Sequence, residues 1–372
     1  MDPGWSSSGR LVREAAPVRP PPFAPNPAWD GVGTTALAPG KLFVAGEYGV
    51  VEAGQPAVLI AVDRRLSVTL RDADAPQELP GHGWSYLAAT RDVLTELARE
   101  RGLRERPFRV RTLSDLEDAD LDGHGPRKYG LGSSAAVTAG AVVALESWYG
   151  LALTPDERLK AALLATWRVN ARASGADVAT ALIGGWVDVG SPDRDAVGAL
   201  LDGARGSVAA VLAQPWPGLH AAALPTPSFR VLVGWSGRPA STTSLVAAVR
   251  GQGGLPPWFV ERSSACVAAL RAAVVADDAA AASDAVAATR ANLLELSAAV
   301  GVPLETPALA TLVEVAREHG LVAKSSGAGG GDCGIALAPA GTDEAALHAA
   351  WERAGVQPLP VELGPGAAIA PR

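Results

Sequence analysis

The 372 residues of this chain suffice for two domains of ordinary size, or for one large domain with insertions. The composition, 48% hydrophobic and 19% charged, is too apolar for a disordered chain and too interrupted by charge for a fibrous one. The 32 basic and 39 acidic residues give a net charge of −7, which argues against a protein that coats nucleic acid or anionic lipid. Two cysteines cannot build a disulfide framework, and no apolar run reaches the roughly 18 residues of a membrane span. We therefore expect a soluble, cytoplasmic protein that binds neither nucleic acid nor a membrane.

The first half of the chain is expected to begin with strands and to continue with helices. Residues 1–34 are rich in proline, serine and glycine without periodicity, which predicts a flexible N-terminal extension. Short apolar or alternating runs then predict strands over 42–45, 57–62 and 66–70. Helical periodicity predicts helices over 84–101, 134–149 and 154–172. The last of these helices has a clear start, because Thr154 and Glu157 form a capping box around Pro155.

The second half of the chain alternates long helices with short strands. The same signals predict, in chain order, a strand over 229–235, two helices within 257–300, a helix from 306 to 320, strands over 321–324 and 334–338, a helix over 342–354 and a strand over 356–363. This order is typical of helices packed on a small antiparallel sheet. We place a domain boundary near residue 225, which gives an N-terminal domain over 35–225 and a C-terminal domain over 226–372.

The strongest local motif is Gly-Leu-Gly-Ser-Ser-Ala-Ala at 130–136, directly before an amphipathic helix. Glycines let successive N–H groups face one point, the helix adds its positive N-terminal end, and serine hydroxyls can reach an oxygen atom or a magnesium ion. The motif therefore fits a phosphate cradle, although a serine-capped helix after a tight turn would look similar. It is not a P-loop, and Pro126, Arg127 and Lys128 stand where a dinucleotide-binding motif needs an apolar strand, which argues against a nicotinamide enzyme.

Two further glycine-rich segments flank this motif in the sequence. In Ala-Pro-Gly-Lys-Leu-Phe-Val-Ala-Gly-Glu-Tyr at 38–48, a turn delivers Lys41 to the edge of an apolar strand, with Glu47 and Tyr48 at its other end. The third segment is Lys-Ser-Ser-Gly-Ala-Gly-Gly-Gly-Asp-Cys at 324–333. Its many glycines lose backbone conformational entropy on folding, and such a run is typical where a ligand approaches the backbone closely. A lysine beside a hairpin and a mobile loop are the plainer interpretations of these segments. Arginine carries almost all other basic charge, so a lysine in such a segment suggests a need for a compact ammonium group.

A fourth pattern, Ser-Gly-Ala-Asp-Val at 174–178, has two interpretations. Ser174 and Asp177 have the spacing of a capping box, in which Asp177 would serve a helix N-terminus. Asp177 can equally be a catalytic carboxylate. Composition and spacing do not separate the two interpretations.

Together these segments resemble the GHMP kinase superfamily, named for galactokinase, homoserine kinase, mevalonate kinase and phosphomevalonate kinase. The motifs occur in the family's order, and the resemblance covers essentially residues 36–365. Where mevalonate-type and galactokinase-type members usually have Gly-Glu-His, this chain has Gly-Glu-Tyr at 46–48. The segments over 323–334 and 236–243, the latter Ser-Gly-Arg-Pro-Ala-Ser-Thr-Thr, are most similar to the bacterial phosphomevalonate kinases.

The resemblance implies a two-domain α+β fold with a ferredoxin-like C-terminal domain and the active site in the cleft between the domains. It implies Mg²⁺-dependent transfer of a phosphoryl group from ATP to 5-phosphomevalonate, which gives ADP and 5-diphosphomevalonate in the mevalonate route to isoprenoids. It assigns Lys41 and Asp177 to catalysis, and Ser133 and Ser134 to magnesium. The implied ATP-binding residues are Lys128, Gly130, Leu131, Gly132, Ser133, Ser134 and Ala135. The implied substrate-binding residues are Lys41, Glu47, Tyr48, Ser241, Ser325, Ser326, Gly327, Ala328 and Gly329.

One departure and one physical argument refine these roles. Some relatives carry a second acidic magnesium ligand upstream of the aspartate, but residues 164–170 contain no acid here. A phosphate monoester has a second pKa of about 6, so the acceptor is already mostly dianionic at neutral pH. We therefore expect Lys41 to act through its charge and Asp177 through orientation or metal contact more than as a base.

Two other functions stay open at this point. A sister kinase that phosphorylates an alcohol, such as mevalonate kinase, would differ in few residues. A non-catalytic protein of the same fold that binds a sugar or nucleotide would be expected to have lost Lys41, Asp177 or the serine loop, and all three are intact.

Overall fold

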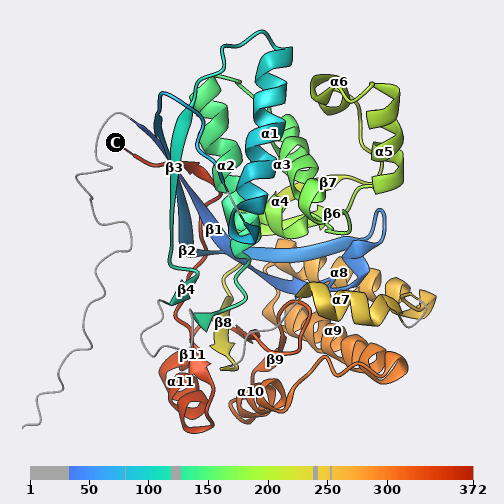
Figure 1. Ribbon diagram of the computed structural model, residues 1–372. Coiled ribbons are helices and arrows are strands. Elements are labelled where there is room, and N and C mark those ends of the chain that lie inside the picture. The colour runs from blue at the N-terminus through green and yellow to red at the C-terminus, as the bar shows by residue number, and fades with distance from the viewer. Residues whose placement is uncertain (1–32, 80, 119–126, 238–241, 252–253, 372) are drawn as a thin grey trace, which may run out of the picture.

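The computed structural model describes residues 33–79, 81–118, 127–237, 242–251 and 254–371. Two antiparallel sheets, each covered by helices, form its two halves (Figure 1). The predicted N-terminal extension lies almost wholly outside the described residues, and residues 33 and 34 already belong to the first strand. Within the described part of the chain, no helix combines the length and the apolar character needed to cross a bilayer.

The first sheet has six strands, with β3 also paired to β2 beside the order β12-β1-β2-β6-β7. Its strands are β1 (Gly33–Ala45), β2 (Pro56–Asp72), β3 (Phe108–Ser114), β6 (Trp186–Gly190), β7 (His220–Leu224) and β12 (Ala368–Ile369). The runs predicted over 57–62 and 66–70 are one long strand. A register shift against β1 between Pro39 and Gly40 absorbs the extra residues of β2, and such a bulge bends a strand. The two halves of β2 can thus pair with different neighbours, β6 and β3.

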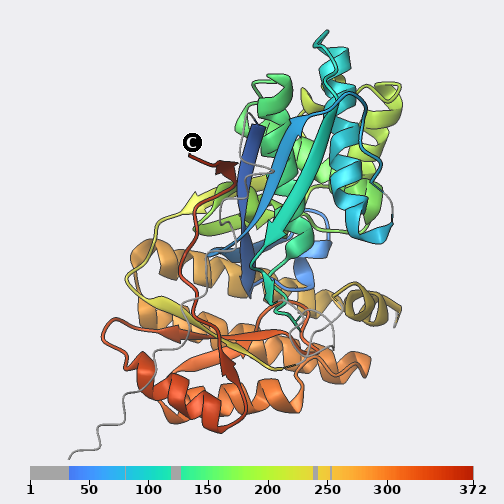
Figure 2. The ribbon, with the colours of Figure 1, turned by 60° about the vertical axis from the view of Figure 1, so that its left-hand side comes forward.

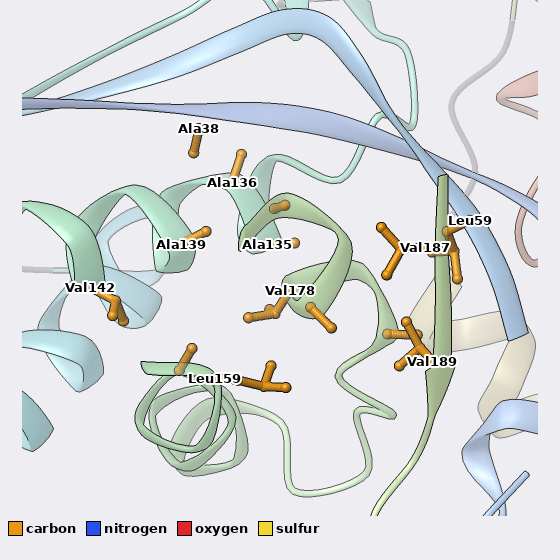
Figure 3. Close-up of a cluster of buried hydrophobic side chains, with 14 of the residues drawn as sticks. Ala38, Leu59, Ala135, Ala136, Ala139, Val142, Leu159, Val178, Val187 and Val189 are labelled. Carbon is orange, nitrogen blue, oxygen red and sulfur yellow. The ribbon is translucent and has the colours of Figure 1, made fainter. Parts of the chain in front are cut away.

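Helices cover one face of this sheet (Figures 1 and 2). They are α1 (Ser85–Glu100), α2 (Ser133–Tyr149), α3 (Pro155–Val169) and α4 (Ala176–Ile183), followed by the smaller α5 (Arg194–Gly203) and α6 (Val208–Leu212). The alanine-rich α2 packs directly on β1 and β2, and a methyl group at Gly140 would already lie 3.0 Å from the Val68 side chain. Figure 3 shows alanine side chains of α2 between Ala38 of β1 and helix α4, with Leu159 of α3 and with Val187 and Val189 of β6 in the same core. Small side chains therefore set how closely the helix that follows the Gly-Leu-Gly motif approaches the sheet.

The predicted helix starts are confirmed where local chemistry fixes them. The capping box at α3 is present, since Thr154 Oγ1 accepts from the Glu157 N–H at 3.2 Å and the Glu157 carboxylate accepts from the Thr154 N–H at 2.9 Å. Thr306 likewise caps α10 (Pro307–Glu318). The sequence missed β3, β6, β7 and β12 of the first sheet and helices α5 and α6.

The second sheet has four strands in the order β11-β8-β10-β9. Its elements are β8 (Arg230–Trp235), α7 (Thr242–Gly251), α8 (Pro257–Ala276), α9 (Ala279–Val300), α10, β9 (Val322–Ser325), β10 (Cys333–Ala338), α11 (Glu344–Arg353) and β11 (Gln357–Pro358). The first strand of this half lies between the third and the last, which is the ferredoxin-like arrangement and confirms the expected fold class. The strand predicted over 356–363 is shorter than expected.

The two halves are not strictly consecutive in the sequence. The chain leaves the first sheet at Leu224 and enters the second at Arg230. After β11 it returns, so that Leu363 bridges to Val62 and β12 pairs with β1. Helix α8 of the second half also contacts β1 and β2. The division near residue 225 stays a prediction, and β12, near the end of the described chain, belongs to the first sheet.

Candidate active site

A cavity of about 400 Å³ lies where the two halves meet. Its wall is formed by the middle and end of β1, the residues around the start of α2, the start of α4, part of α7 and the loop between β9 and β10. The three glycine-rich segments and the Ser-Gly-Ala-Asp-Val segment, which span nearly 300 residues of sequence, all contribute to it. The fold thus brings together the segments that sequence analysis singled out.

The N-terminus of α2 opens into this cavity. Gly130 and Gly132 have left-handed backbone, with φ of 75° and 80°, which only glycine adopts without strain. No side chain among the described residues caps the helix, so its first-turn N–H groups at Ser133, Ser134 and Ala135 are available to an anion. This local geometry decides against the serine-capped helix that sequence alone had left open.

Lys41 stands beside this helix end. Its backbone N–H donates to Leu131 O at 2.8 Å, and its ammonium group is 3.5 Å from Gly130 O. A methyl group at Gly132 would lie only 2.7 Å from Lys41 Cε. The glycine therefore lets the lysine side chain run across the start of α2, where its charge adds to the positive end of the helix.

Asp177 occupies the first turn of α4 and lines the same cavity. The capping-box interpretation of this segment is wrong, because the N-cap is Gly175 with φ 82° and no described side chain caps the helix. Asp177 Oδ1 accepts from the N–H of Val178 at 3.0 Å. Burial, with a smaller contribution from the Asp177 charge, raises the pKa of Tyr86, which also lines the cavity.

The Gly-Glu-Tyr segment forms a tight, strained turn. The Gly49 N–H donates to Glu47 O at 2.6 Å, and Tyr48 between them has φ 60° and ψ −51°. This is the rare γ-turn with positive central φ, and a non-glycine residue held in such a conformation costs of order 1–3 kcal/mol. Burial, and secondarily the Glu47 charge, raises the pKa of Tyr48, so its hydroxyl remains a proton donor. It donates to Ala328 O at 2.6 Å.

The residues predicted from the third glycine segment divide into two groups. Gly327 and Ala328 line the cavity, whereas Ser325, Ser326 and Gly329 do not. The Ser326 hydroxyl donates to a backbone oxygen of β1, and a methyl group at Gly329 would lie 2.1 Å from Leu304 O. Their assignment to substrate binding stays a prediction.

Four more of the predicted site residues line the cavity. The cavity wall includes Glu47, Tyr48, Lys128 and Leu131. Ser241 lies outside the described residues.

The cavity wall also contains polar side chains to which sequence analysis assigned no role, among them Tyr86 and Asp332. Asp332 belongs to the third glycine-rich segment, but its role could not be inferred because Gly130, the residue on which it packs, is distant in sequence. Its carboxylate packs on the first motif, since a methyl group at Gly130 would lie 2.4 Å from Asp332 Cγ. The Tyr86 side chain projects from the first turn of a predicted helix, and no local signal distinguishes it from a surface residue.

The donor set in the cavity is compatible with Mg²⁺. The hydroxyls of Ser133 and Ser134 and the carboxylate of Asp177 share its wall. In the described part of the chain, no group of three or more histidine, cysteine or acidic side chains is arranged to hold a metal ion by itself. Such a sparse set suits Mg²⁺, which usually takes one or two carboxylates and completes its shell with substrate phosphates and water.

Comparison with known proteins agrees with this geometry. The family models for the N-terminal domain and the C-terminal region of GHMP kinases match residues 88–185 and 270–357. A phosphomevalonate kinase of Streptomyces sp. (strain CL190) is 40% identical over 367 residues, which covers 87% of this chain and 95% of that protein. The chain belongs to the GHMP kinase family.

Two further relatives share a lower identity with this GHMP kinase. The mevalonate kinase of Thermococcus sibiricus is 27% identical over 359 residues, or 88% of this chain and 95% of that protein. The structure of Streptococcus pneumoniae phosphomevalonate kinase in complex with phosphomevalonate and AMPPNP superposes with a TM-score of 0.78 at 27% identity, over 88% of this chain and 99% of that one. The α+β fold expected from the sequence is thereby confirmed, and the chain is a phosphotransferase by family.

Proposed function

We propose that the chain transfers the terminal phosphoryl group of ATP to 5-phosphomevalonate and so forms ADP and 5-diphosphomevalonate, a step of the mevalonate pathway. The observation that supports this most is the convergence of Lys41, the uncapped start of α2 and Asp177 on one cavity. This convergence occurs in a chain 40% identical to a phosphomevalonate kinase along most of its length.

The start of α2 is suited to the ATP phosphates. Its N–H groups and the positive end of the helix attract negative charge without any need to neutralise a protein group first. Lys128 adds a second cation to this side of the cavity wall. We assign the ATP phosphates to Lys128 and to the loop from Gly130 to Ala135.

Mg²⁺ would be held by Ser133 or Ser134 and by Asp177, and when bound it would neutralise charge on the phosphates. The protein's own contribution is to hold both anionic reactants against their repulsion. Lys41 lies beside the phosphate-binding helix end, where its ammonium group can contact the transferred phosphoryl group and the acceptor phosphate. The α4 turn fixes Asp177 on the same wall, where it orients the attacking oxygen.

The acceptor chemistry defines what Asp177 has to do. An acceptor phosphate with a second pKa of about 6 has lost most of its protons at pH 7, so proton abstraction adds little. Loss of the Lys41 charge is then more harmful than loss of the Asp177 carboxylate as a base.

Turnover of Lys41→Met and Asp177→Asn, measured by ADP release between pH 6 and 9, tests these roles. We expect a loss of about 10²–10³-fold in kcat for Lys41→Met that varies little with pH. An Asp177→Asn defect that exceeds the lysine defect and follows a single ionisation would reject the assignment.

The same assay separates the related functions. Purified protein with Mg²⁺-ATP is offered 5-phosphomevalonate or mevalonate, and we expect ADP release with the phosphorylated acceptor alone. Release with mevalonate would identify a mevalonate kinase. ATP binding without ADP release from either acceptor would identify a non-catalytic binding protein.

A further inference from the structure

Three side chains connect the third glycine segment to β1 and to the strained turn that follows it. We call these contacts the clasp. Its members are Ser326 Oγ, which donates to Phe43 O at 3.0 Å, Tyr48 Oη, which donates to Ala328 O at 2.6 Å, and Lys324 Nζ, which donates to the Glu47 carboxylate and to Ser325 O. Alternate residues at the end of β9 and in the loop after it, at 324, 326 and 328, thus attach to the end of β1 and the turn that follows it, about 280 residues earlier.

The ionic contact of the clasp is fully buried. The side chains of Lys324 and Glu47 are 0% and 1% exposed. A buried ion pair gains little stability over apolar packing of the same size, because desolvation of both charges offsets their attraction. Lys324 is nevertheless one of the few lysines in the sequence. The pair is better explained by the geometry that it imposes, since it joins β9 of one half to the end of β1 of the other.

The clasp contacts hold the strained turn at Glu47 and Tyr48 in place. Tyr48 holds its positive φ only because its surroundings determine it, and the clasp fixes both Glu47 and Tyr48. The same contacts fix the loop, whose Gly327 and Ala328 form part of the cavity wall. The turn and the loop therefore cannot move independently.

We propose that Lys324, Glu47 and Tyr48 are positioning residues, which hold Gly327 and Ala328 in the conformation that receives the phosphorylated acceptor. The pair also keeps the cavity wall neutral at this point, since Glu47 lines the cavity and an unpaired carboxylate there would repel a dianion. Lys324 thus acts on the acceptor through Glu47 and the loop, without contacting it. This inference rests on the proposed function for the identity of the acceptor.

Tyr48→Phe is the mildest test, because it removes one hydrogen bond and keeps the ring. Tyr149→Phe is the matched control, since the Tyr149 hydroxyl also makes one part-buried hydrogen bond, to Thr95 Oγ1 at 2.9 Å, but lies outside this cavity. We expect Tyr48→Phe to raise KM for 5-phosphomevalonate roughly three- to tenfold, while KM for ATP stays within about twofold. Tyr149→Phe should leave both constants unchanged. Equal kinetics in the two variants would overturn the proposal.

The charge contribution is tested by Lys324→Met, Glu47→Gln and the double variant. Lys324→Met leaves a buried carboxylate unpaired and should raise the acceptor KM more than tenfold, whereas the neutral double variant should recover part of this loss. Lys160→Met is the control, because Lys160 is also buried, bonded to Gln214 O at 2.6 Å, and remote from the cavity wall. If the single variants do not fold, Tyr48→Phe still decides. A double variant as impaired as the two single losses combined would contradict the coupling.

Hydrogen exchange separates failure of the clasp from failure of the proposed function. Backbone amides of residues 325–331 should exchange faster in Tyr48→Phe than in the wild type or in Tyr149→Phe, whichever substrate the enzyme uses. Unchanged exchange would overturn the clasp. Wild-type protein that releases no ADP with 5-phosphomevalonate, but shows the expected exchange, would refute the proposed function alone.

Discussion

The two glycines that bound α2 provide a controlled test of the role of Lys41. Gly132 is the N-cap and Gly150 the C-cap of the same helix, and both have left-handed backbone with φ of 80° and 68°. A methyl group at Gly132 would lie 2.7 Å from Lys41 Cε and 3.2 Å from its Cγ. At Gly150 it would meet no described atom within 4 Å.

Alanine at either position has the same backbone strain, about 1–2 kcal/mol. At Gly132 there is a second effect, because the flexible Lys41 side chain has to move away from the added methyl group. Displacement of a catalytic group by about an ångström costs about 10²-fold in rate, or about 2.7 kcal/mol of transition-state stabilisation. Gly132→Ala should therefore lose activity far out of proportion to its loss of stability.

The assay compares kcat/KM from ADP release with the free energy of unfolding from urea titration. We expect Gly132→Ala to lower kcat/KM about 100-fold and Gly150→Ala less than about twofold, with both lowering unfolding free energy by about 1–2 kcal/mol. In a Lys41→Met background, Gly132→Ala should cause little further loss of activity. Equal activities in the two single variants, or full additivity with Lys41→Met, would refute the reasoning.

Two predictions concern stability alone. Thr154→Ala should lower the free energy of unfolding by about 1 kcal/mol at pH 7. The Glu157 carboxylate accepts from the Thr154 backbone N–H, which lowers the pKa of Glu157, so this contact contributes fully above that carboxyl's ordinary pKa and is lost as pH falls through the lowered value. The loss of unfolding free energy in Glu157→Ala, measured by urea titration at pH 7 and pH 3, should therefore shrink in acid, and a loss that grows in acid would contradict this sign. Trp351→Phe should cost about 2–4 kcal/mol, because the fully buried indole fills core volume and donates to Leu312 O at 3.0 Å and both contributions are lost, while acceptor KM measured by ADP release should not change.

The elements that the sequence predicted well are those fixed by local chemistry. The capping box of Thr154 and Glu157 and the Thr306 cap mark helix starts because their hydrogen bonds span only three residues. The Gly-Leu-Gly motif predicted a turn of the backbone before α2, and Gly130 and Gly132 make it with left-handed backbone. The ferredoxin-like order of the second sheet followed from the resemblance to a family, which carries long-range information that no single pattern contains.

The errors have a common physical cause. The Ser174 and Asp177 spacing suggested a capping box, but the N-cap of the helix is Gly175. Leu163 packs so closely on Gly175 that a methyl group there would lie 2.0 Å from the Leu163 side chain. This tertiary contact helps to fix the turn before the helix. The strands predicted over 57–62 and 66–70 merged because a bulge against β1 allows one strand to bend. In each case a partner distant in sequence decided the outcome.

The sequence by itself determined the chemistry that the chain can perform: an ammonium group, the start of a helix, a carboxylate and glycines that permit close approach of a phosphate. Only the tertiary structure decided which of these groups face one cavity and which hold the others in place. Lys324 and Glu47 are 277 residues apart, and Tyr48 and Ala328 are 280 apart. Their contacts arise from the packing of two sheets and are not encoded in any local pattern, since burial and distance between remote segments are properties of the folded chain alone.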